Sequence, residues 1–81
     1  MNEKWTVTAY KDLFARFGQV MDIEPQGAGV FHVWLKRPDV TYAWIKALEK
    51  KLRKNNLRIF GFRIEPEDCK YLQIALVITP R

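Results

Sequence analysis

The sequence contains no serine and only one cysteine and one histidine among its 81 residues. Without serine, a Ser-His-Asp catalytic triad is excluded. Cys69 alone cannot form an internal disulfide, and Cys69 with His32 supplies too few ligands for a usual structural zinc site. A Cys–His nucleophile would need these two residues to meet, but Cys69 falls in an expected turn and His32 in a distant strand. We therefore expect no enzyme activity and no cofactor.

Long apolar stretches are also missing. No apolar run reaches the roughly 18 residues of a membrane span, and the first residues, MNEKWTV, lack the apolar core of a signal peptide. With no disulfide, these features predict a cytoplasmic protein that does not enter membranes. A length of 81 residues corresponds to a single domain, residues 1–81.

Positive charge is concentrated in one part of the chain. The formal net charge is +5 and the pI about 9.6. The segment from Lys36 to Arg58 holds eight basic residues against two acidic ones, a net of +6, so the remainder sums to −1. This excess favours an anionic partner, with nucleic acid first. The alternative is that the charge serves solubility alone.

The clearest helix is expected between Pro38 and Asn55, with Asp39 as its N-cap. Its apolar stripe at helical spacing consists of Val40, Trp44, Ile45, Leu48 and Leu52. The opposite face carries Lys46, Glu49, Lys50 and Arg53, with Lys51 and Lys54 near its edges. Pairing of Glu49 with Arg53 would indicate an ordinary solvated face, whereas an unbalanced basic face suits phosphate contacts.

The remaining elements complete the order α-β-β-α-β-β. A shorter helix is expected over Ala9–Phe17. The expected strands are Val20–Glu24, Val30–Lys36, Leu57–Ile64 and Tyr71–Thr79. The predicted fold is a two-layer α+β sandwich, with both helices on one face of a mostly antiparallel four-stranded sheet. A fifth strand over Glu3–Thr8 is an alternative.

Alternation within the strands predicts which side chains face the helices. In the last strand the inward set is Leu72, Ile74, Leu76 and Ile78, and in the second strand it is Phe31, Val33 and Leu35. Aromatic residues alternate away from this core at His32, Trp34 and Tyr71. In the third strand the outward set is either Phe60 and Phe62 or Ile59 and Arg63. A contiguous set of exposed aromatics would need a partner.

The stretch LFARFGQVMDI (Leu13–Ile23), followed by GVFHVWL (Gly29–Leu35) and the long helix, resembles the middle of an RNA-recognition motif. The resemblance covers less than half of the chain. It implies that Val30 and His32 stand where that family places stacking aromatics. The chain departs from the family in three ways. Val30 is not aromatic, little room precedes Ala9 for a first strand, and an extra long strand follows the family's fourth strand.

The sequence therefore predicts a small non-catalytic module that binds RNA or DNA. Phosphates would be held by Lys36, Arg37, Lys50, Arg53, Lys54 and Arg58. Bases would stack on His32, Trp34 or Tyr71. The alternative is a protein-interaction module, either a homodimer or an accessory factor that docks on a larger protein through the open sheet face.

Overall fold

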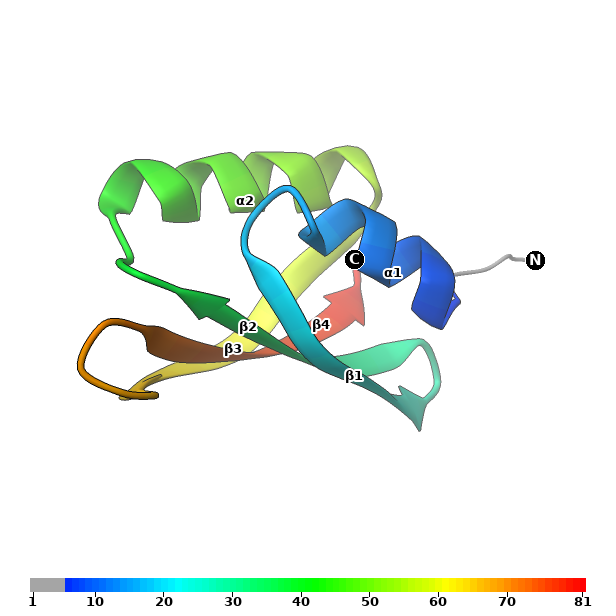
Figure 1. Cartoon of the computed structure of the whole chain (residues 1–81). Helices are drawn as coiled ribbons and strands as arrows, with labels where there is room; N and C mark the ends of the chain where they lie inside the picture. Colours follow the sequence, from blue (N-terminus) through cyan, green and yellow to red (C-terminus); the bar gives the residue numbers. More distant parts are fainter. Residues whose placement is uncertain (1–5) are drawn as a thin grey trace.

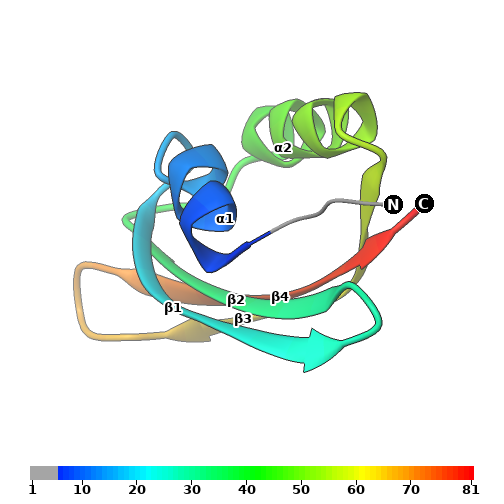
Figure 2. The ribbon, with the colours of Figure 1, turned by 90° about the vertical axis from the view of Figure 1, so that its right-hand side faces the viewer.

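Two helices lie side by side on one face of a four-stranded antiparallel sheet in the computed structural model of this chain, which describes residues 6–81 (Figures 1 and 2). The elements are α1 (Val7–Phe14), β1 (Gln19–Gly27), β2 (Val30–Arg37), α2 (Tyr42–Lys54), β3 (Leu57–Pro66) and β4 (Leu72–Pro80). The sheet order is β1-β2-β4-β3, so β1 and β3 are the edge strands. The predicted α+β class and element order are confirmed.

The alternative of a fifth strand over residues 3–8 is wrong for Thr6–Thr8, because these residues cap and begin α1. Residues 3–5 lie outside the described part of the chain.

Both helices start at threonine caps rather than at the residues expected from the sequence. Thr6 and Thr41 are extended, and each side-chain hydroxyl accepts a hydrogen bond of 3.1 Å from the backbone N–H three residues later. The expectation of Asp39 as the α2 cap was wrong, since its carboxylate lies 3.1 Å from Arg37 instead. The first helix was also expected too far along the chain, because it ends at Phe14 and not at Phe17.

The core lies between the helices and the two central strands. Its strand residues are Phe31, Val33 and Leu35 of β2 and Ile74, Leu76 and Ile78 of β4, all buried as predicted. Leu72 is only half-buried, at the start of β4. The helices contribute Tyr10, Leu13, Phe14, Leu48 and Leu52. Burial raises the pKa of Tyr10 to about 12, which keeps its phenol neutral at physiological pH.

The β1–β2 connection is shorter than the loop expected over residues 25–29. Gly27 pairs with Val30, so the turn consists of Ala28 and Gly29, both with positive φ (54° and 79°). Positive φ at both central residues is the signature of a type I′ hairpin turn. Strand β1 therefore runs on through Pro25, which an edge strand tolerates.

A β-bulge in β3 makes both of the outward sets predicted for this strand wrong, because each set contains one residue that faces the helices. The register shifts between Ile59 and Gly61, with Ile59 opposite Ile78 and Phe62 opposite Leu76. Directly opposed residues share a sheet face, so Ile59 and Phe62 both lie on the helix side. The extra residue, Phe60, breaks the alternation.

Leu76→Ala is expected to destabilise the protein by about 2–5 kcal/mol, because its side chain is 2% exposed in the centre of the core. Val77→Ala is the matched control, because Val77 is the residue next to Leu76 and its side chain points to the open face. We expect it to lower the free energy of unfolding by less than about 1 kcal/mol. Chemical denaturation measures both, and equal midpoints for the two variants would contradict the facing of β4.

Candidate nucleic-acid interface

The outer face of α2 carries the largest excess of positive charge in the fold. Residues 42–54 contain five basic side chains and one acidic side chain, Glu49. Lys46, Lys50, Arg53 and Lys54 are exposed and Lys51 is half-buried. Within residues 6–81 the ion pairs are Arg37–Asp39 and Arg63–Glu65, so Glu49 and Arg53 do not pair. The basic face of α2 is thus not neutralised by neighbouring carboxylates.

Part of this charge has a structural explanation. Lys51, Arg53 and Lys54 stand in the last turn of α2, where the helix carbonyls favour cations. That effect fades within one turn, so it does not explain Lys46 and Lys50. Lys46 does contact the exposed Tyr42 ring, with its Nζ 5.8 Å from the ring centroid.

The open sheet face, on the far side from both helices, holds the predicted stacking residues. Trp34 lies opposite Ala75 and His32 opposite Val77, and their rings meet edge to face at 5.8 Å. Their neighbours on β1 are acidic, since Asp22 pairs with Trp34 and Glu24 with His32. A phosphate held beside these rings would meet two carboxylates.

Charges on this open face balance. The basic members are Lys36, Arg58 and Arg63, and the acidic ones are Asp22, Glu24 and Glu65, as their cross-strand partners show. The Lys36 Nζ lies 4.7 Å from the Tyr71 ring centroid, and Arg58 Nε donates to Thr79 Oγ1 at 3.3 Å. Unlike α2, this face has no net charge to attract a polyanion.

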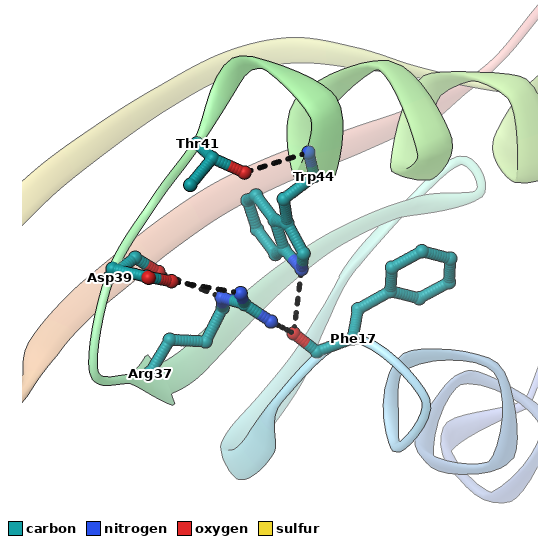
Figure 3. A network of polar contacts seen from close by, with 5 residues as sticks. All are labelled: Phe17, Arg37, Asp39, Thr41 and Trp44. Carbon is teal, nitrogen blue, oxygen red and sulfur yellow. Dashed lines mark hydrogen bonds and ion pairs between the residues drawn. The ribbon is translucent and has the colours of Figure 1, made fainter.

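Arg37 is committed to the fold (Figure 3). Its Nη1 donates to the Phe17 carbonyl at 2.9 Å, its Nε donates to the Asp39 carbonyl at 2.8 Å, and its Nη2 lies 3.1 Å from the Asp39 carboxylate. The Trp44 indole donates to the same Phe17 oxygen at 2.8 Å, and the Arg37 guanidinium lies 4.7 Å from its ring centroid. This network joins the segment after α1, the end of β2 and the start of α2.

Glycine at position 18 permits this approach. A Cβ there would lie 2.9 Å from Arg37 Cγ and 3.3 Å from the Lys36 carbonyl oxygen. The absence of a side chain at Gly18 therefore lets the chain pass close to Arg37.

The nine predicted interface residues consequently do not form one site. Lys50, Arg53 and Lys54 share the outer face of α2. On the opposite side of the molecule lie His32, Trp34, Lys36, Arg58 and Tyr71. The ninth residue, Arg37, is only 21% exposed within its network. A nucleotide held on the outer face of α2 does not also stack on Trp34, because Trp34 lies on the open face and the sheet separates that face from the helices (Figure 2).

Sequence reasoning missed a third surface, an apolar groove of about 320 Å³ between α2 and β3. Trp44, Ile45 and Leu48 line one side, and Phe60, Phe62 and Ile64 line the other. The sequence signal for this groove is the apolar run of β3, which a strict alternation of inward and outward residues does not describe.

No family model, curated protein or solved structure matches this chain. The resemblance of residues 13–35 to an RNA-recognition motif therefore stands as a local likeness. Between residues 6 and 81, no three His, Cys, Asp or Glu side chains gather as metal ligands would. No helix in the described part of the chain is long and apolar enough to cross a membrane.

Arg37→Lys keeps the charge but removes the planar fork that reaches three acceptors. We expect it to lower the free energy of unfolding by about 1.5–3 kcal/mol, the range for hydrogen bonds to charged groups. Arg58→Lys is the control and should change little, because Arg58 is exposed and its side chain makes, within residues 6–81, only one exposed hydrogen bond, to Thr79, and a 5.9 Å contact with the Phe60 ring. If denaturant midpoints of the two variants coincide, the Arg37 network does not support the fold.

Proposed function

We propose that this protein is a small non-catalytic nucleic-acid-binding module that holds the phosphate backbone of RNA or DNA on the outer face of α2. The observation that carries the proposal is the set of exposed basic side chains on α2, which make no ion pair with any residue of the described part of the chain. Such cations release condensed counterions from a polyanion when they bind it, which is the main source of sequence-independent affinity.

The spacing along α2 supports a backbone contact. Lys46, Lys50 and Lys54 recur every four residues, so they form a ridge with about 6 Å between neighbours along the axis. On α1 and the turn after it, exposed Lys11 and Arg16 outnumber exposed Asp12, so this part of the same layer adds positive charge. A nucleic-acid strand that follows the lysine ridge meets one carboxylate contributed by α2, that of Glu49.

The balanced charges of the open sheet face limit the proposed contact to the helix side of the protein. With three basic and three acidic side chains there, and with Asp22 and Glu24 beside the aromatic rings, the open sheet face attracts phosphate poorly. The proposed contact is therefore electrostatic and confined to the helix layer, without base stacking.

The double variant Lys50→Glu with Arg53→Glu tests the α2 contact directly. Both residues are exposed, so folding should survive. Two attractive contacts become repulsive, and on duplex DNA the slope of log K against log salt should fall by about 1.8 or more. Fluorescence anisotropy with labelled single- and double-stranded oligonucleotides, across a salt series, measures the slope.

Arg58→Glu with Lys70→Glu is the control, because it changes the net charge equally at two exposed sites away from the outer face of α2. A generic charge effect would weaken binding equally in both double variants. Equal losses, or no binding by the wild-type protein at low salt, would contradict the proposal.

Trp34→Ala is expected to leave both affinity and salt slope unchanged, since its ring lies across the sheet from α2 and beside Asp22. Stacking on this ring would instead be worth about 1–3 kcal/mol per base, with little change in slope. The same anisotropy titrations distinguish these results. A loss of binding free energy of that size would show that the open sheet face takes part in nucleic-acid binding.

A further inference from the structure

Three of the large apolar side chains that the fold leaves exposed line the groove between α2 and β3. Their exposed fractions are 69% for Phe60, 56% for Phe62 and 39% for Ile64. At about 200 Å² per ring, the two phenylalanines alone leave roughly 250 Å² in water. A patch of this size on so small a protein is characteristic of an interaction surface. It is distinct from the basic face of α2.

The backbone beside this groove is also unpaired within residues 6–81. Among these residues strand β3 is an edge strand that pairs with β4 alone. In the turn that joins them, the Glu67 N–H donates to the Tyr71 carbonyl at 2.9 Å, which makes these two a hydrogen-bonded pair. Such pairs alternate along an antiparallel ladder, so Arg63 and Glu65 bond to β4 while the N–H and C=O groups of Phe62 and Ile64 point outwards.

The free edge is short and has defined ends. The bulge at Phe60 interrupts it on one side, and Pro66, which has no N–H, ends it on the other. The usable edge runs over residues 62–66, and its midpoint is Ile64.

We propose that β3 pairs with β3 of a second copy of this chain, antiparallel and centred on Ile64, to form a symmetric dimer with a continuous eight-stranded sheet. In this register Ile64 faces Ile64 of the second copy, and the two residues exchange hydrogen bonds. The Phe62 N–H donates to the Pro66 carbonyl of the second copy, and the reverse bond follows by symmetry. Four backbone hydrogen bonds result, with apolar side chains on the helix side of the sheet.

Charge complementarity selects both the second copy and the register. On the open face, Arg63 lies opposite Glu65 of the second copy, and this pair occurs twice. A register centred on Arg63 would oppose two arginines, and one centred on Glu65 would oppose two glutamates. Both side chains are exposed and already attract each other within one chain, at 3.1 Å. In a symmetric strand pairing, Arg63 and Glu65 of each copy therefore both lie opposite a side chain of the other sign.

The decisive experiment mixes two single variants. Arg63→Glu gives a chain with two acidic side chains at positions 63 and 65, and Glu65→Arg gives a chain with two basic ones. Each homodimer then opposes like charges at both pairs and should be about tenfold weaker or more. In the mixture, every cross-strand pair joins opposite charges, so a heterodimer should form. The bridge within each chain stays broken, so recovery arises only between chains.

Light scattering and native mass spectrometry measure the outcome. We expect a wild-type mass of twice 9.6 kDa, weakened dimers for each variant alone, and a heterodimer on mixing. Ile64→Lys should give a folded monomer by circular dichroism, because it places two charges at the symmetry axis. Lys50→Glu with Arg53→Glu should still dimerise, which separates this inference from the proposed function.

Three results would overturn the inference. They are a monomeric wild-type protein at the highest soluble concentration, an unchanged dimer in Ile64→Lys, and a mixture of the two charge variants without a heterodimer.

Discussion

Two helices cannot cover both faces of a four-stranded sheet, and this constraint organises the surface of the protein. The helices bury the inward residues of β2 and β4 and leave the opposite face open (Figure 2). They also stop short of the outer edge of β3, so Phe62 and Ile64 lie on the helix side yet remain exposed. The basic face, the open face and the groove follow from where the helices sit.

The position of α2 is fixed by a few polar contacts at its start. The Phe17 carbonyl accepts hydrogen bonds from both Arg37 and Trp44, and Thr41 caps the helix close by (Figure 3). A carbonyl bonded twice, once by a charged donor, orients its neighbours strongly. This arrangement ties the start of α2 to the segment after α1, and so sets which side chains of α2 face outwards.

Periodicity in the sequence was enough to predict the layers, because Ile74, Leu76 and Ile78 alternate without interruption and are buried. The bulge at Phe60 could not be predicted in this way, since one inserted residue in an apolar run leaves the composition unchanged.

The candidate site was predictable only in part for a related reason. Charge counting identified Lys50, Arg53 and Lys54, which are exposed on one face. It could not separate them from Arg37, because one partner of Arg37 is the carbonyl of Phe17, which is far away in the sequence. It also could not place Asp22 and Glu24 beside Trp34 and His32, because strand register depends on tertiary contacts.

The proposed dimer and the proposed nucleic-acid contact are geometrically compatible. The symmetry axis of an antiparallel strand pair stands perpendicular to the sheet, so both copies of α2 would lie on the same side. Their basic faces would then form one larger cationic surface, with the merged groove between them. Repulsion between the helices would be limited, because charges separated by more than about 8–10 Å are largely screened at physiological salt. Counterion release adds over phosphates contacted, so two helices on one polyanion would bind with a steeper salt dependence than one.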